Sequence, residues 1–230
     1  MPDRLVIYRK DAKTYDLLIS REDHQGNLLK ALRSICDFSG KDIADLGAGT
    51  GRLAFLLAPF IHSALLTDNS GPMLDVAKEK LTEMKFANFS THVFDIGTVP
   101  ADDASFDVVL AGWALISVAL RGDPWKEAVR KALREMQRVL RPGGTIILIE
   151  SMGTGQEQPK PPNQHFADYF QLLENDGFEK RTMRTDYKFA SLEEKEKLLT
   201  FFFDKEMLDA GVKNDSLIYP ECTGIWWKQY

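Results

Sequence analysis

The chain has 230 residues, of which 44% are hydrophobic and 27% charged, a balance typical of one α/β domain with a complete core. Its net charge of −5 and the absence of a basic cluster argue against a nucleic-acid partner. No apolar run is long enough for a membrane span and the N-terminal residues carry charges, so we expect no secretory leader, no membrane association and a cytoplasmic location. Cys36 and Cys222 match neither a zinc pattern nor a disulfide framework, so we expect no metal.

The apolar pattern predicts alternating helices and strands. An amphipathic helix over residues 28–38 comes first. Strands are then predicted at 43–46, 64–67, 90–94, 106–111 and 145–150, with helices at 53–58, 72–84 and 124–140. A surface loop and candidate lid follows at 152–162, then a helix at 164–175, a strand at 178–189, a helix opened by Ser191 and a strand at 223–228. Such alternation predicts a parallel sheet covered by helices on both faces.

A glycine-rich turn directly follows the first predicted strand. Gly47, Gly49 and Gly51 lack Cβ atoms, so the backbone can adopt positive φ angles and a ligand can approach its N–H groups closely. Dinucleotide-binding loops place their third glycine one residue later, where this chain has Arg52. The nearby carboxylate of Asp45 would also repel a pyrophosphate, so the turn predicts a cofactor loop of another kind.

Three predicted strands end in a carboxylate. These are Asp45, Asp68 and Asp95, and Asp68 follows Gly47 by about the 20 residues at which an acidic side chain accepts ribose hydroxyls. Asp95 is placed to accept an adenine amino proton. The alternatives are structural: Asp45 and Asp68 could each cap the helix that follows, and Asp95 could belong to an ordinary acidic turn.

These segments resemble the motifs of the class I S-adenosylmethionine-dependent methyltransferases. Residues 45–51 resemble the family's first motif, and residues 67–74, which include Met73, resemble its second. Asp95 and Ile96 resemble its adenine contact, and residues 140–145 the turn before its fifth strand. The resemblance implies a Rossmann-like, doubly wound sheet of seven strands, mostly parallel, with the last strand antiparallel.

The resemblance also implies roles for individual residues. Gly47, Ala48, Gly49 and Gly51 would flank the methionine moiety of the cofactor and Asp68 would hold its ribose. Asn69 and Ile96 would contact adenine, and Trp113 would lie near the sulfonium. For Trp113 the alternative is a core tryptophan that anchors the following helix.

The chain departs from the family between the sixth and seventh strands, where residues 191–211 insert an extra aromatic-rich helix. This helix is either an acceptor-specific cap or the surface of a homodimer, because its apolar face must be buried somewhere. We divide the single domain into an N-terminal helical cap (1–40), a cofactor-binding core (41–150) and a substrate-side segment (151–230).

The predicted function is methyl transfer from S-adenosylmethionine to a small molecule, with S-adenosylhomocysteine as product. In-line transfer requires positioning and exclusion of water rather than a dedicated catalytic residue. His165 is the best-placed candidate base, against the alternative of a surface histidine at a helix start. Side chains expected to line the acceptor pocket are Tyr15, Trp113, His165, Phe166 and Tyr169.

Two other functions are compatible with these motifs. One is a non-catalytic S-adenosylmethionine-binding or partner-docking protein. The other, an NAD(P)-dependent oxidoreductase, is disfavoured by Arg52 and by the lack of a recognisable Tyr-x-x-x-Lys pair.

Overall fold

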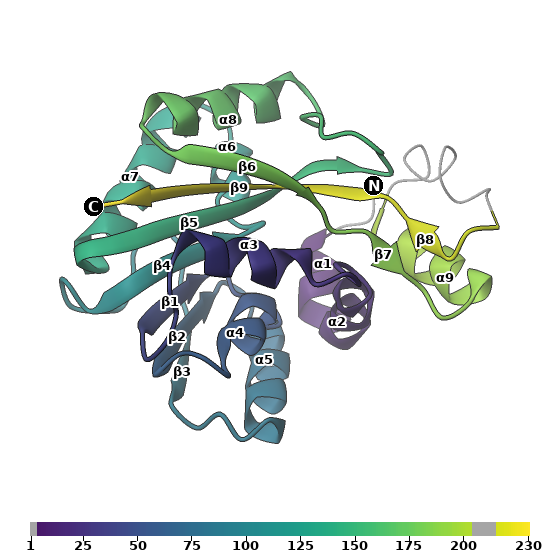
Figure 1. The fold of residues 1–230 in the computed structure, drawn as a ribbon, viewed down its shortest axis with the longest axis horizontal. Coiled ribbons are helices and arrows are strands. Elements are labelled where there is room, and N and C mark those ends of the chain that lie inside the picture. Colours follow the sequence, from purple (N-terminus) through teal and green to yellow (C-terminus); the bar gives the residue numbers. More distant parts are fainter. Residues whose placement is uncertain (1–3, 204–214) are drawn as a thin grey trace.

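The computed structural model describes residues 4–203 and 215–230, and its centre is a seven-stranded sheet in the order β3-β2-β1-β4-β5-β9-β6 (Figure 1). The strands are β1 (Asp42–Leu46), β2 (Ser63–Asp68), β3 (Phe89–Val93), β4 (Phe106–Gly112), β5 (Leu140–Thr154), β6 (Glu179–Arg184) and β9 (Glu221–Gln229). Only β9 runs antiparallel to its neighbours, β5 and β6. The predicted fold is therefore confirmed, including its antiparallel last strand.

Helices cover both faces of this sheet (Figure 1). One face carries α3 (Asn27–Ile35), α4 (Arg52–Leu57) and α5 (Gly71–Glu83), and the other α6 (Ile116–Ala119), α7 (Trp125–Val139) and α8 (Gln164–Asn175). The helical spacing of apolar residues explains this packing. On α7, for example, Val129, Leu133 and Met136 are all buried against the sheet. Because the crossovers leave β1 and β4 toward opposite faces, the carboxyl ends of these strands are the expected ligand site.

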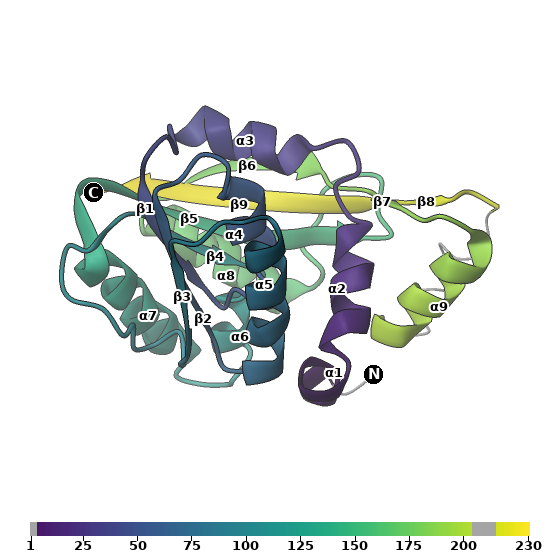
Figure 2. The ribbon, with the colours of Figure 1, turned by 90° about the horizontal axis from the view of Figure 1, so that it is seen from below.

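Two further helices lie beside that edge (Figure 2): α1 (Arg4–Lys10) and α2 (Ala12–Ser20). Both pack on α5, where the Ser70 hydroxyl donates a 2.9 Å hydrogen bond to the Tyr8 carbonyl. Lys80 of α5 forms a 2.6 Å ion pair with Asp16 of α2. The N-terminal segment thus contains three helices, of which the apolar pattern predicted α3.

The predicted strand over 178–189 is divided in two. Residues up to Arg184 form β6, whereas β7 (Tyr187–Lys188) pairs with β8 (Ile218–Tyr219) in a separate small sheet. The division occurs at Thr185, whose hydroxyl lies 2.6 Å from that of Thr223 on β9.

The inserted helix α9 (Leu192–Phe202) lies between β7 and β8 in the chain. Its buried residues Leu198 and Leu199 pack against Leu18 of α2 and Phe189. The described part of the helix therefore covers this chain's own N-terminal and C-terminal segments. Residues 204–211 of the predicted helix lie outside the described residues, and the homodimer stays a prediction.

Strand β5 is longer than predicted. It pairs with β9 as far as Thr154 opposite Glu221, so the loop expected at 152–162 begins only after Thr154. The antiparallel pairing continues because β9 supplies a partner strand where the parallel neighbour β4 has already ended at Gly112. Within residues 4–203 and 215–230, no helix has the length and apolar character needed to cross a membrane.

Candidate functional site

The glycine turn joins β1 to α4 with a left-handed backbone. Gly47, Gly49 and Gly51 have φ angles of 70°, 55° and 74°, which side chains other than glycine rarely adopt. An added Cβ on Gly51 would lie 2.8 Å from the Cβ of Ala77, and one on Gly47 would collide with Ala114. The glycines are thus needed for both backbone conformation and close packing, while Ala48 between them donates its N–H to the Thr67 carbonyl at 2.8 Å.

Asp68, at the end of β2, holds this turn in place. Its Oδ2 accepts a 2.9 Å hydrogen bond from the N–H of Gly49, and its Oδ1 accepts a 2.8 Å bond from Ser70. Burial raises the pKa of Asp68, although the two backbone bonds lower it. The structure therefore brings Asp68 and the glycine turn together, as the neighbouring strand ends predicted.

Asp45, at the end of β1, is 1% exposed, and its Oδ2 accepts a 3.3 Å hydrogen bond from the N–H of Ala54 in the first turn of α4. This bond is the helix-capping role weighed as the alternative. Burial raises the pKa of Asp45 to about 7, and the charge of Asp68 adds to the rise. Two carboxyl groups with raised pKa values therefore adjoin the glycine turn, and neither forms an ion pair with a described residue.

Asp95 has a structural role in the loop after β3. Its Oδ1 accepts a 2.9 Å bond from the N–H of Gly97, and its Oδ2 pairs with Arg121 at 2.8 Å. Partial burial raises its pKa, but these two partners hold the pKa of Asp95 below its usual range. Ile96 beside it is buried in the core on the α7 face. These contacts match the alternative in which Asp95 belongs to an ordinary acidic turn. The contact with adenine stays a prediction.

The second predicted motif begins beneath α1. Asn69 is exposed and lines a shallow hollow of about 120 Å³ together with Tyr8 and Ser70. Met73, in contrast, is buried against Ala12 of α2. The N-terminal helices therefore cover the start of α5 and leave Asn69 accessible.

Tyr15 of α2 lies in an aromatic cluster at the same edge. Its ring is 5.3 Å from that of Tyr8 and 5.1 Å from that of Phe202 on α9. Burial raises the pKa of Tyr15, with smaller contributions from neighbours that include Asp68 and Glu22. Tyr15 thus lies between the carboxylate at the end of β2 and the inserted helix.

Trp113 follows β4 with a φ of 53° and packs against Arg52. The Arg52 guanidinium lies 4.4 Å from the ring centroid of Trp113, and its Nη1 donates a 2.7 Å bond to Oε2 of Glu22. Two other polar atoms of this ion pair have no hydrogen bond: neither Nη2 of Arg52 nor Oε1 of Glu22 has a partner among the described residues. In this structure, the cation on the Trp113 ring is therefore a side chain of the chain itself.

Comparison with known proteins shows what this chain is similar to. Residues 44–148 match the family model described as "Methyltransferase domain". A demethylmenaquinone methyltransferase of Lactococcus lactis subsp. lactis (strain IL1403) is 32% identical over 151 residues, which cover 63% of this chain and 57% of that protein. The same comparison for Staphylococcus aureus (strain MRSA252) gives 30% identity over 175 residues, 73% of this chain and 66% of that protein. Residues 44–148 of this chain are therefore similar to the methyltransferase domain family.

The chain spans less than two thirds of the length of each of these relatives. A solved S-adenosylmethionine-dependent methyltransferase from Aquifex aeolicus has the same fold, with a TM-score of 0.57 and 17% identity over 94% of this chain and 96% of that chain. The cofactor of the class I family is S-adenosylmethionine.

The structure corrects the expectation for the side chains of α8. Tyr169 is completely buried, and its hydroxyl donates a 3.3 Å bond to the buried carboxylate of Glu150 instead of lining a pocket. Phe166 packs edge-on against Phe170 beside the same core. The reason is that residues at helical spacing on α8 face the sheet.

The side chain of His165 also makes contacts within the fold. Its Nε2 lies 2.9 Å from the carbonyl oxygen of Ala119, and its ring is 4.9 Å from that of Trp125. Because a carbonyl only accepts, Nε2 carries the proton in this bond, and Nδ1 is the ring nitrogen left to accept one. These contacts support the structural alternative for His165.

Two glutamates that the sequence motifs did not predict, Glu22 and Glu221, also lie near this site. Glu221, at the start of β9, is 1% exposed, and neither of its carboxylate oxygens makes a well-formed hydrogen bond with a described residue. Burial raises its pKa and the charge of Glu22 adds to that rise. An isolated glutamate before a strand gives no signal in the sequence, because its partners come from distant elements.

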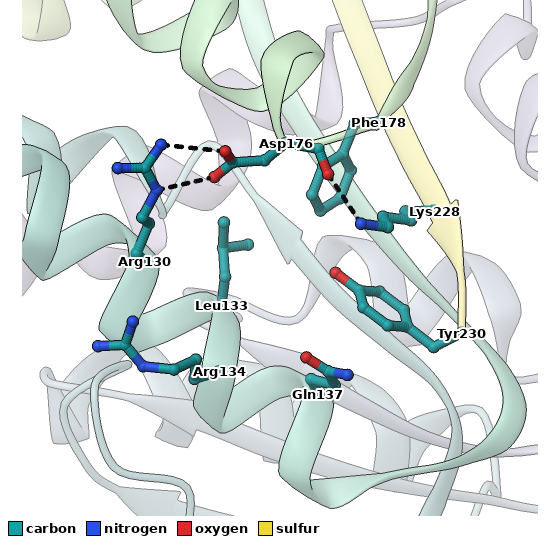
Figure 3. A pocket seen from close by; sticks show the side chains of 8 residues that line it. All are labelled: Arg130, Leu133, Arg134, Gln137, Asp176, Phe178, Lys228 and Tyr230. Atoms are coloured by element: carbon teal, nitrogen blue, oxygen red, sulfur yellow. Dashed lines mark hydrogen bonds and ion pairs between the residues drawn. The ribbon is translucent and has the colours of Figure 1, made fainter.

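A cavity of about 270 Å³ lies at the opposite, amino-terminal edge of the parallel strands (Figure 3). Its charged groups are already engaged. Arg130 forms two bonds to Asp176, at 3.1 and 3.0 Å, and Lys228 donates to the Asp176 carbonyl at 2.8 Å. This cavity is remote from the glycine turn, so we do not place the acceptor there.

Proposed function

We propose that this chain is a methyltransferase that binds S-adenosylmethionine across the carboxyl ends of β1, β2 and β3 and transfers its methyl group to a small molecule. The observation that carries this proposal is the junction of Asp68 with Gly49, beside the buried carboxyl of Asp45. Two carboxyl groups without a cationic partner favour a cationic ligand, which stabilises their ionised forms, over a pyrophosphate, which the ionised forms would repel.

The residues at this junction suit the separate parts of the cofactor. Each Asp68 oxygen accepts one backbone bond and retains lone pairs for the two ribose hydroxyls. The buried, unpaired Nη2 of Arg52 and hydroxyl of Thr50 suit the carboxylate of the methionine moiety. The backbone of Gly47, Ala48, Gly49 and Gly51 would flank that moiety.

The adenine would lie farther along the same edge. Asn69 is accessible there, and the proposed contacts of Asp95, Ile96 and Met73 would surround the ring. Asp95 would accept the amino proton while remaining paired with Arg121, since a carboxylate oxygen can accept more than one bond.

When bound, the cofactor supplies an electrophilic methyl group on a cationic sulfur. The side chains then have to hold the acceptor in line and exclude water. Tyr15 and Trp113 lie at the edge where such an acceptor would enter, and α1, α2 and α9 cover it. His165, Phe166 and Tyr169 are assigned no part in this step. The small-molecule acceptors of the relatives, named for demethylmenaquinone, support a small acceptor here.

Calorimetry with S-adenosylhomocysteine and, separately, with NAD⁺ tests the cofactor assignment. We expect binding of S-adenosylhomocysteine and none of NAD⁺, and the reverse result would end the proposal. Transfer of labelled methyl groups to a panel of small molecules, with demethylmenaquinone included, tests the activity.

A second candidate function is that of a non-catalytic S-adenosylmethionine-binding protein. The observation that favours it is the Arg52 guanidinium, which occupies a face of Trp113 where a sulfonium could otherwise lie. Binding of S-adenosylhomocysteine without methyl transfer to any acceptor would support this alternative.

A further inference from the structure

Strands β5 and β9 extend beyond the end of β4 (Figure 1). Glu221 pairs with Thr154 at the far end of this extension, several residues past the last pairing of β4 with β5 and one residue past the last pairing of β9 with β6. Although its side chain is almost completely buried, neither carboxylate oxygen has a well-formed hydrogen bond among the described residues. Buried carboxylates without partners are rare in folded proteins, because losing water without compensation is costly.

Backbone hydrogen bonds bring the segment of Glu22 close to Glu221: the Asp23 N–H donates to the Thr185 carbonyl at 3.1 Å, and the Thr185 N–H donates to the Glu221 carbonyl at 2.9 Å. Burial raises the pKa of Tyr187, and the charges of Glu22 and Glu221 add to the rise, whereas Arg52 opposes it. Tyr15 makes a smaller contribution to the same shift. We call Tyr15, Glu22, Arg52, Tyr187 and Glu221 the buried polar cluster.

The buried polar cluster adjoins the proposed cofactor site. Tyr15 is influenced by both Asp68 and Glu22. Arg52 begins α4 directly after the glycine turn and stacks on Trp113, which follows β4. A molecule that contacts Glu221 would therefore lie beside the methionine end of the cofactor.

The unsatisfied atoms of the buried polar cluster are mostly acceptors. Neither oxygen of Glu221 nor Oε1 of Glu22 has a well-formed hydrogen bond among the described residues, and Nη2 of Arg52 is an unpaired donor. The hydroxyls of Ser151 and Thr154 nevertheless lie close enough to Glu221 to lower its pKa. If Arg52 neutralises Glu22, an ionised Glu221 leaves the cluster with a net negative charge. A protonated amine offers up to three donors and a positive charge, whereas an alcohol offers one donor and none.

We propose that Glu221, assisted by Glu22, recognises a basic amino group on the methyl acceptor. This inference rests on the proposed function, since the cluster is read as the acceptor side of the cofactor site. Arg52 acts as a positioning residue, because its 2.7 Å bond to Oε2 orients Oε1 of Glu22. The hydroxyls of Ser151 and Thr154, next to Glu221 on β5, lower its pKa and so favour the ionised form that an ammonium group requires.

Proton release gives a specific signature of this pairing. The raised pKa of Glu221 favours its protonated form before binding, and most amines are protonated at neutral pH. Formation of an ammonium–carboxylate pair therefore releases about one proton per amine bound. An alcohol that binds in the same place releases none.

The test is calorimetry on the full chain, with and without saturating S-adenosylhomocysteine, in two buffers of different ionisation enthalpy. The probes are benzylamine and 2-phenylethylamine, compared with benzyl alcohol and 2-phenylethanol. We expect the amines to bind at least tenfold more tightly than the alcohols, with proton release. Glu221→Gln should abolish both the preference and the proton release, and Glu22→Gln should reduce the preference.

Glu150→Gln is the matched control. Glu150 is also a buried glutamate at this edge of the sheet, but its Oε1 already accepts bonds from Ile116 and Tyr169. This variant should retain the amine preference. Equal affinity for amines and alcohols, no binding of either amine, or an unchanged preference in Glu221→Gln would overturn the inference and show that water alone satisfies the cluster. Failure of S-adenosylhomocysteine to bind would instead contradict the proposed function.

Discussion

The Oδ2 atom of Asp68 accepts a 2.9 Å hydrogen bond from the backbone N–H of Gly49, so the end of β2 directly fixes the glycine turn after β1. Asp68 therefore has two tasks in the proposed site. It shapes the turn around the methionine moiety, and it offers its remaining lone pairs to the ribose. Loss of the carboxylate should affect cofactor binding through both.

Asp68→Ala should weaken S-adenosylhomocysteine binding by about 10- to 100-fold, since a charge-assisted contact contributes on the order of 1.5 to 3 kcal/mol. Calorimetry measures this change directly. Asp75→Ala, an exposed position on α5, is the control and should bind normally. Undiminished binding by Asp68→Ala would show that the ribose lies elsewhere.

Asp45 should impose a pH dependence on folding stability. Its pKa in the folded protein is about 7, against an ordinary value of 3.8, so the folded state keeps a proton that the unfolded state has already lost. The free energy of unfolding should therefore fall as pH rises from about 4 to 7, by on the order of 1.4 kcal/mol per unit of pKa shift.

Asp45→Asn removes this titration and should flatten the curve of Tm against pH in that window, without ligand. Some slope should remain, because burial also raises the pKa of Glu150 to about 8. Asp75→Asn should follow the wild-type curve. Parallel curves for the wild type and Asp45→Asn would mean that Asp45 is ionised in the folded protein.

The sequence was sufficient to predict the junction of Asp68 with Gly49 but not the buried polar cluster. Neighbouring parallel strands end at one edge, so residues at their ends meet whatever the details of packing. Glu221 arrives differently, on an antiparallel strand that extends past the sheet, and Glu22 comes from the end of α2. Their proximity depends on how the N-terminal helices and the small β7–β8 sheet pack together, which no local periodicity encodes.

Some side chains of α8, in contrast, were predicted at the acceptor site but are buried in the core. Tyr169 and His165 were expected near the acceptor because their segment follows the carboxyl end of β5. The chain does pass that edge, but α8 then turns its aromatic face to the sheet and buries Tyr169. The position of these residues in the sequence predicted which edge of the sheet they approach. The face of α8 on which each residue lies determines whether its side chain is exposed.

The buried ion pair of Arg52 and Glu22 should be strongly coupled. Arg52→Met alone leaves the Glu22 carboxylate buried without its partner and should destabilise the protein by about 3 to 5 kcal/mol. The double variant Arg52→Met with Glu22→Leu removes both charges and should lose less than Arg52→Met alone. Urea unfolding of the two single variants and the double variant measures the coupling. Additive losses would show that the two charges are independently solvated.

A comparison of Gly51 with Gly40 distinguishes two reasons why a position at positive φ requires glycine: backbone strain and close packing. Their φ angles are similar, 74° and 70°, but an added Cβ on Gly51 would lie 2.8 Å from the Cβ of Ala77 on α5, whereas one on Gly40 would have no neighbour within 4 Å. Gly40→Ala should therefore cost only the backbone strain, about 1 to 2 kcal/mol.

Gly51→Ala should cost about 1 to 3 kcal/mol more in urea unfolding, because α5 must move away from the turn. That movement would also shift Asp68, which precedes α5, so the variant should bind S-adenosylhomocysteine more weakly than Gly40→Ala does. If the two alanine variants unfolded at the same urea concentration, the turn and α5 would have to be less tightly packed than this geometry requires.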